Sequence, residues 1–562
     1  MADNTTETSK SRLSSDPLID ELLHDFIGQL KEYTETQTRN LSELTRIGIA
    51  LSATRNLDQL LEMIVDRARQ FTNADGGTLY LVNEDESALD FTIVQTESLG
   101  FRMGGITGGP ITLPSVPLRH GDEPNDANVC AYVANSGELV NIPDVYQVEG
   151  FNFEGTRVFD QRNNYRSKSM LVIPMRDHQD DIIGVLQLIN ARDSKTGATI
   201  PFPERYQELT AALASQAAIA ITNARLISEL QNLFDSFIKT IAAAIDEKSH
   251  YTGGHIERVA ELTMEIAHHI NAAQSGPFAE VRFTEDEMQE LRLAAWLHDT
   301  GKITTPEYVV DKRTKLETIF DRRELVRLRI ELAIANARRK AAEVRAVTMP
   351  LEAGMDDEGT KSAAEVEAKC RQLQDDLKFI LESNTTSEFV PDENIERLEK
   401  IAARRVETSL GPEPLLTDDE LQNLKVRKGN LTDEERRIIN NHAAMTIKLL
   451  EQLPFPKRMR NVPLYAGAHH EKLNGTGYPN GLKGDEIPLQ ARIMALADIF
   501  EALTARDRPY KKPMMLSQAV KILGFMVKDG ELDGDLVDFF LDRKLHLTYA
   551  RKYMDPEKID ME

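Results

Sequence analysis

Residues 297–303 read Leu-His-Asp-Thr-Gly-Lys-Ile, and the pair His298-Asp299 belongs to a series of metal-ligand residue types along the chain. The series comprises five histidines and two aspartates: His255, His298, Asp299, His442, His469, His470 and Asp498. Histidine and aspartate together suit first-row ions such as iron, manganese or zinc, and a carboxylate can bridge two of them. Seven ligands exceed what one ion normally uses, so the series predicts two ions that share an aspartate.

Distinct motifs surround these positions. The chain reads Tyr-Thr-Gly-Gly-His-Ile-Glu-Arg-Val at 251–259, Leu-Thr-Asp-Glu-Glu at 431–435 and His-His-Glu-Lys-Leu-Asn-Gly-Thr-Gly-Tyr-Pro at 469–479. Ala-Asp-Ile-Phe-Glu-Ala-Leu-Thr follows at 497–504, and Arg-Pro-Tyr-Lys at 508–511. In this order the motifs resemble those of the HD-GYP family of bacterial cyclic di-GMP phosphodiesterases, within the HD metal-dependent phosphohydrolase superfamily. The resemblance covers about residues 230–312 and 428–545.

The resemblance implies an all-α catalytic domain, formed by 249–312 and 428–545, that binds two divalent ions, iron or manganese. Asp299 would bridge the ions. His255, His298 and Asp498 would complete one site, and His442, His469 and His470 the other. With two cations lowering the pKa of water, a hydroxide nucleophile becomes available near neutral pH.

Other residues are implied to contact the substrate. They are Lys302, Arg508, Lys511 and the segment Gly477, Tyr478 and Pro479, with Asp299 and Lys302 as the catalytic pair. Lys302 follows His298 by four residues, so we expect both on one face of a helix, where the ammonium can donate to a phosphate oxygen or leaving group. The implied activity is hydrolysis of cyclic di-GMP to linear pGpG, to GMP, or to both.

Three positions depart from the family pattern. Tyr251 stands where some members have a glutamate and bind a third ion, which favours two ions here. Asn474 replaces the usual aspartate, so its side chain can form hydrogen bonds but supplies no charge. Glu501 occupies a position where aspartate is common, a change expected to be harmless.

Two other functions stay open at this point. The chain could be a non-catalytic receptor or scaffold for a cyclic dinucleotide, with the Gly-Tyr-Pro region or an inserted segment contacting protein partners. It could also hydrolyse another cyclic nucleotide with the same centre. Loss of a ligand would favour the receptor, and all seven are present.

Composition narrows the class of protein. The formal charge is −24, from 91 acidic and 67 basic side chains, which would repel nucleic acid. Two cysteines, Cys130 and Cys370, argue against a disulfide scaffold and for a reducing compartment. The first fifteen residues lack the pattern of a signal peptide, and no run of eighteen apolar residues occurs. We therefore expect a cytoplasmic protein without a membrane span.

The N-terminal part predicts a sensor. Residues 1–15 are polar and expected to be disordered, and 16–51 to form a helix. From 52 to 225, a helix at 56–71 and strands at 78–82, 91–95, 138–142, 170–174 and 182–189 indicate an α+β domain. Segments such as Gly184-Val185-Leu186-Gln187-Leu188-Ile189-Asn190 resemble a GAF domain. Ala191 replaces the lysine that follows the asparagine in cyclic-nucleotide-binding members, so a small-molecule ligand and ligand-free dimerisation both stay open.

A single helix is predicted over 204–248, with 226–248 connecting the sensor to the first histidine motif. Its apolar residues recur every three or four positions, which is typical of a helix–helix seam: Leu226, Leu230, Leu233, Phe237 and Ile241. We expect this seam to form a parallel homodimer.

Residues 313–427 interrupt the catalytic motifs. Apolar positions spaced by three or four, among charged residues, predict a helical hairpin with a turn near 349–361. It is either a solvated arm or a surface for protein partners. Residues 546–562 are expected to form a C-terminal tail.

Overall fold

The computed structural model describes residues 16–54, 56–248, 254–348, 356–385, 389–506 and 514–562. The chain divides between Leu233 and Phe234 into two compact units. The segment expected to be disordered, 1–15, lies outside the described residues. None of the helices in the described residues combines the length and the hydrophobicity that a membrane span requires.

The first unit is an antiparallel sheet with helices on both faces. Its strand order is β3-β2-β1-β9-β8-β7, with β10 paired to β9 and β4 to β2. The elements are α1 (Pro17–Ala53), α2 (Leu57–Thr72), β1 (Ala74–Val82), β2 (Ala88–Thr96), β3 (Phe101–Met103), β4 (Val116–Pro117), β5 (Arg119–His120), β6 (Glu123–Pro124), α3 (Val129–Ser136), β7 (Val140–Ile142), α4 (Glu154–Asn163), β8 (Met170–Arg176), β9 (Ile182–Arg192), β10 (Thr199–Ile200) and the start of α5 (Glu204–Lys248).

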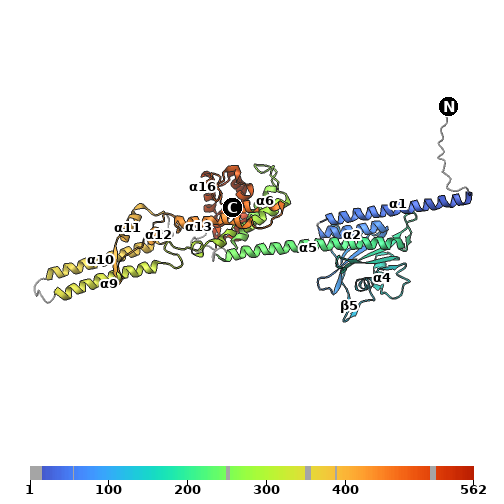
Figure 1. The fold of residues 1–562 in the computed structure, drawn as a ribbon, viewed down its shortest axis with the longest axis horizontal. Helices are drawn as coiled ribbons and strands as arrows, with labels where there is room; N and C mark the ends of the chain where they lie inside the picture. The colour runs from blue at the N-terminus through green and yellow to red at the C-terminus, as the bar shows by residue number, and fades with distance from the viewer. Residues whose placement is uncertain (1–15, 55, 249–253, 349–355, 386–388, 507–513) are drawn as a thin grey trace, which may run out of the picture. The chain divides into compact units, whose positions relative to one another are not determined.

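Alternating side chains on the central strands build two separate cores, because successive residues of a strand point to opposite faces. Leu79 and Leu171 join the core beneath α1, α2 and α5, the helices that lie along one face in Figure 1. Tyr80 and Val172, one residue further along each strand, join the core that includes α3. This α+β architecture confirms the predicted fold class of the N-terminal part.

The N-terminal helix is part of that domain. The last turns of α1 place Leu44, Ile47 and Leu51 in the same core as α2 and α5. The sequence predicted a boundary between a helix ending at 51 and a domain starting at 52. Because these residues are buried among sheet residues, the helix and the sheet share one hydrophobic core.

The second unit is mostly helical, as expected. It contains the end of α5, then α6 (His255–Asn271), α7 (Glu285–Leu297), η1 (Thr300–Thr304), α8 (Glu307–Val310), α9 (Arg323–Thr348), α10 (Asp356–Ser383), α11 (Asp392–Ala402), β11 (Arg405–Thr408), β12 (Gly411–Pro414), α12 (Asp418–Leu424), α13 (Asp433–Leu450), η2 (Lys457–Met459), α14 (Val462–Gly467), η3 (Gly484–Glu486), α15 (Leu489–Thr504), α16 (Leu516–Lys528), α17 (Gly534–Asp542), α18 (Leu545–Tyr553) and η4 (Pro556–Lys558). Capping boxes at Thr284 and Thr432 start α7 and α13, the helices that carry or precede site histidines.

The insertion is larger than a hairpin. Helices α9 and α10 lie side by side, as predicted (Figure 1). Residues 356–361, expected in the turn, belong to α10, while 349–355 lie outside the described residues. A third helix, α11, the hairpin β11–β12 and α12 complete a core of its own, whose buried members all fall between Leu316 and Leu424. These later elements were missed because only the two longest apolar stripes stand out in the sequence.

The expected C-terminal tail is instead a folded part of the helical unit. Helix α18 buries Leu547, Tyr549 and Ala550, and Met554 follows it into the same core as α6 and α15. The apolar spacing within 545–554 supplies one buried face, which explains why this segment packs against the domain.

Candidate metal centre

Five segments of the second unit bring the predicted ligands together. His255 opens α6, His298 caps the C-terminus of α7, and Asp299 follows directly. His442 lies in the middle of α13, and Asp498 in the middle of α15. The pair His469 and His470 comes just after α14. Residues that are far apart in the sequence therefore meet in one place.

The ligands form two groups. The ligand atoms of His255, His298 and Asp299 lie within 4.8 Å of one another, and so do those of His442, His469 and His470. Asp498 lies beside the first group, with its Oδ1 3.3 Å from His255 Nε2.

Asp299 joins the two groups, because its carboxylate faces both of them. Its Oδ2 lies 3.4 Å from His298 Nε2, and its Oδ1 lies 3.4 Å from His442 Nε2. One oxygen is thus presented to each group, which is the arrangement that a bridging ligand requires.

Hydrogen bonds to the backbone fix how three of the histidine rings are turned. Nδ1 of His298 donates to the carbonyl of Ala295 (2.8 Å), and Nδ1 of His442 donates to the carbonyl of Ile439 (2.6 Å). Nδ1 of His469 donates to the carbonyl of Ala466 (2.5 Å). A proton on Nδ1 leaves the lone pair on Nε2, the form in which imidazole binds a metal.

The Nε2 atoms of three histidines show whether the site fits a metal ion. In His298, His442 and His469 this atom is buried and has no hydrogen-bond partner within the described part of the chain. Buried polar atoms are nearly always paired, so three unpaired acceptors beside two carboxylates call for an additional partner. One cation in each ligand group would satisfy these atoms, and the donor set of imidazole and carboxylate suits iron, manganese or zinc.

Glu501 contacts a predicted ligand, which the sequence motifs did not reveal. Its buried carboxylate accepts a hydrogen bond from His255 Nδ1 at 2.5 Å and from Arg258 Nε at 2.9 Å. Glu501 lies three residues after Asp498 on α15, so both share a helix face. That spacing was the available signal. The carboxylate orients His255, and the harmlessness of glutamate at this position stays a prediction.

Burial and charge set the protonation of the centre. Burial lowers the pKa of His470 to about 4 and that of His469 well below its usual value, so both are neutral. Burial alone would raise the pKa of Asp299, but the charge of Lys302 holds this pKa well below the ordinary value. The carboxylate is therefore ionised, as a bridging ligand must be.

Lys302 does not share a helix with His298. Helix α7 ends at Leu297, and Lys302 lies in the 3-10 helix η1. Its Nζ nevertheless reaches the site, 2.5 Å from Asp299 Oδ2. The expected common helix face was wrong because the backbone tightens at Asp299, where φ is −99° and ψ is 8°.

Close packing holds η1 against α13. A Cβ on Gly301 would lie 1.9 Å from the carbonyl oxygen of His442, so only glycine fits. The Thr446 hydroxyl donates to the carbonyl of His298 and accepts from the N–H of Gly301. These contacts join the segment that carries Asp299 to the helix that carries His442.

The Gly-Tyr-Pro segment forms one wall of the centre. The Tyr478 ring lies 4.8 Å from the His470 ring, centroid to centroid, at 39°. Gly477 approaches the backbone so closely that a Cβ would meet the nitrogen of Lys472 at 2.3 Å. The buried carboxylate of Glu471 accepts from the N–H groups of Asn480 and Leu482, which holds the segment in place.

Asn474 braces this loop through its hydrogen bonds. Its amide donates to the carbonyl of Asp529, and its oxygen accepts from Thr476. An aspartate could not make the first of these bonds. The other predicted positions, Arg508, Lys511 and Tyr251, lie outside the described residues.

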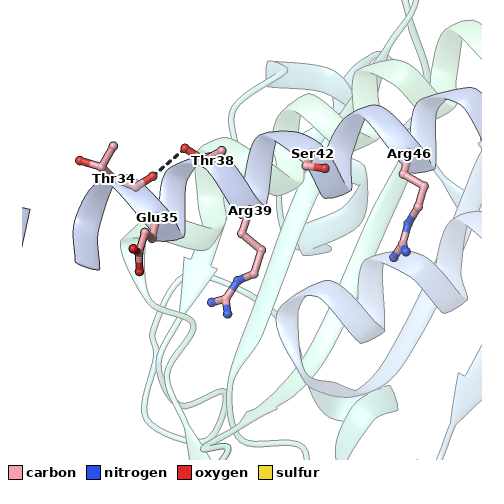
Figure 2. A pocket seen from close by; sticks show the side chains of 6 residues that line it. All are labelled: Thr34, Glu35, Thr38, Arg39, Ser42 and Arg46. Carbon is pink, nitrogen blue, oxygen red and sulfur yellow. Dashed lines mark hydrogen bonds between the residues drawn. The ribbon is translucent and has the colours of Figure 1, made fainter. Parts of the chain in front are cut away.

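A hollow of about 690 Å³ elsewhere, along α1, offers no comparable chemistry among its described lining residues (Figure 2). Hydroxyls of Thr34 and Thr38 bond to carbonyls four residues earlier in the same helix. Polar side chains of one helix line it: Thr34, Glu35, Thr38, Arg39, Ser42 and Arg46.

Comparison with protein families agrees with the two units. Residues 56–221 match the GAF domain, and residues 252–379 and 417–536 match two families that are each described as an HD domain. The interval between the two HD matches falls inside the insertion.

Three curated relatives match shorter stretches. The chain is 48% identical over 98 residues to 3'3'-cGAMP-specific phosphodiesterase 3 of Vibrio cholerae, covering 17% of this chain and 20% of the relative. A probable cyclic di-GMP phosphodiesterase of the same organism is 38% identical over 141 residues, 24% of this chain and 32% of the relative. The cyclic di-GMP phosphodiesterase of Thermotoga maritima is 35% identical over 124 residues, which cover 22% of this chain and 33% of the relative. The matches thus span a third or less of each relative's length.

Proposed function

We propose that this chain, which joins a GAF domain to an HD domain, is a metal-dependent phosphodiesterase that hydrolyses cyclic di-GMP to pGpG, GMP or both. The GAF domain would regulate it. The observation that carries the proposal is the pair of ligand groups joined by Asp299, with three buried Nε2 atoms that lack a partner among the described residues. The names of two of the relatives support the substrate.

The residues of the site would have separate roles in binding metal and substrate. His255, His298, Asp299 and Asp498 would hold one divalent ion, and Asp299, His442, His469 and His470 the other, iron or manganese. When bound, such ions neutralise charge on phosphate oxygens and lower the pKa of water. Lys302 would donate to a phosphate oxygen or leaving group, and Tyr478 would bound the substrate site with Gly477 and Pro479. Arg508 and Lys511 are proposed phosphate contacts.

Relatives named for 3'3'-cGAMP make that dinucleotide the second candidate substrate. The decisive assay uses the whole chain loaded separately with iron and with manganese, each offered cyclic di-GMP and 3'3'-cGAMP, with products resolved by chromatography. We expect linear product from cyclic di-GMP. Tight binding of the intact dinucleotide without any linear product, under both metals, would support a receptor instead.

We also propose a homodimer through α5. Leu230 is 66% and Leu233 65% exposed, and Leu226 and Phe237 are exposed as well. Ile241, predicted in the same seam, instead packs beside Ile256 of its own chain. An exposed stripe of this spacing on one helix is satisfied by a second copy.

Sedimentation of the whole chain tests the dimer. We expect a dimer for the wild type and a monomer for the double variant Leu230→Asp and Leu233→Asp, because charge on the seam opposes helix pairing. Ser228→Asp is the control, since it adds the same charge at an exposed position on the face opposite the stripe. A double variant that stays dimeric would place the interface elsewhere.

We also propose domain limits, partners and a location for the protein. We propose that the connecting helix spans 226–248 and that 249–312 with 428–545 carry the catalytic motifs, while the sensor core also includes the end of α1 and the catalytic core extends to Met554. A small-molecule ligand for the GAF domain, protein partners for the insertion and a cytoplasmic location are proposed on sequence grounds alone.

A further inference from the structure

We infer that the last turn of α5 positions the metal centre, through two oppositely charged residues, Asp246 and Lys248, that hold the segments carrying His255 and Lys302. The inference rests on the proposed function, because it concerns residues proposed to bind an ion and the substrate. Asp246 and Lys248 form hydrogen bonds with the backbone of those segments, so both are positioning residues.

Asp246 supplies the cap that α6 lacks. The N-cap of α6 is Gly254, with φ 77° and no side-chain cap of its own. Asp246 Oδ2 accepts from the N–H of Gly254 at 3.1 Å. A carboxylate at a helix N-terminus pairs free N–H groups and opposes the helix dipole. It thereby fixes the turn from which His255 projects.

Lys248 holds the second segment. Its Nζ donates to the carbonyl of Lys302 at 3.3 Å and to the carbonyl of Ile303. Both carbonyls belong to η1, the short helix that follows Asp299. A cation at the carbonyl end of a helix is favourable for the same reason that an anion is at the other end. Lys248 therefore fixes the backbone of Lys302.

Further contacts fasten this part of α5 to the helical unit. Asp235 pairs with Arg292 at 2.7 Å, and Lys239 lies 5.8 Å from the Trp296 ring. Ala242 and Ile245 pack against Ile256, the residue after His255. Any shift of the last turn of α5 would thus move two site segments together.

The same helix also begins in the sensor. Earlier in α5, Leu213, Ala217 and Ile221 belong to the core of the GAF domain. One continuous helix therefore carries both a sheet-facing stripe and the two residues that hold the site segments.

The test compares matched variants of the whole chain. Asp246→Ala removes both acceptors, whereas Asp246→Asn keeps an oxygen that can accept. Lys248→Met removes the donors, whereas Lys248→Arg keeps them. Glu247→Ala is the control, because Glu247 lies on the same turn and is exposed. Each protein is titrated with Mn²⁺, and kcat and KM are measured with cyclic di-GMP.

We expect Asp246→Ala to bind Mn²⁺ roughly tenfold more weakly, the scale of losing an outer-shell partner, with recovery in Asp246→Asn. Lys248→Met should keep its Mn²⁺ and lose roughly tenfold in kcat at little change in KM, with recovery in Lys248→Arg. Variants that match Glu247→Ala in both measurements would overturn the inference. So would a loss of thermal stability alone.

Hydrogen exchange separates this result from the proposed function. The amide of Gly254 should exchange faster in Asp246→Ala than in wild type or Asp246→Asn, whether or not the protein is an enzyme. Unchanged exchange overturns the inference. A wild-type protein that binds no Mn²⁺ overturns the proposed function instead, and the exchange result still decides whether Asp246 holds α6.

Discussion

Alanine in place of Asp299 is expected to remove both metal ions and to reduce hydrolysis of cyclic di-GMP below detection. Each oxygen of this carboxylate faces one ligand group, at 3.4 Å from His298 and from His442. Without it, the histidines of the two groups share no anionic ligand. Metal analysis of anaerobically purified protein should find close to two ions per chain in the wild type.

Folding must be followed beside metal content, because removing one partner of a buried charge pair costs about 3–5 kcal/mol. Asp299→Asn, which keeps the shape of the side chain, separates lost charge from lost packing. Asp376→Ala is the matched control: Asp376 is also buried and pairs with Arg397 and Arg404, but it lies in the insertion. A full metal complement with normal turnover in Asp299→Ala would contradict the bridging assignment.

The convergence of the seven proposed ligands could be predicted because each lies within a short local motif. His298-Asp299 and His469-His470 are adjacent in sequence, and a helix or turn brings each pair to the site at once. The three backbone acceptors of the rings, such as Ala295 for His298, also lie only three residues away. Local spacing in the sequence was therefore sufficient to predict most of the residues that come together in the centre.

Contacts between residues that are far apart in the sequence could not be predicted from local spacing. Glu501 and His255 are separated by 246 positions, and nothing in either motif alone states that their side chains meet. The helical register of Lys302 failed for a different reason, since one backbone turn at Asp299 ended α7 early. Sequence spacing assumes continuous helices, and active-site segments often interrupt them.

Lys302→Ala is expected to lower kcat roughly a hundredfold or more, while two ions per chain remain. The substrate carries two phosphates and the chain a formal charge of −24, so nearby cations must offset long-range repulsion. Loss of one preorganised donor costs about 3 kcal/mol of transition-state stabilisation, which sets the expected factor. The measurement is single-turnover kinetics with metal content determined on the same samples.

Because of the position of Lys302, the variant Lys302→Ala reports on metal affinity as well as on the catalytic rate. Its ammonium lies 2.5 Å from Asp299 Oδ2, so the lysine also balances the charge of the proposed bridging ligand. If that balance were its main role, Lys302→Ala would change metal affinity and leave kcat near the wild-type value once ions are saturating. A donor to the reacting phosphate instead predicts lost kcat at full metal occupancy. Lys448→Ala, an exposed lysine on α13, should change neither quantity.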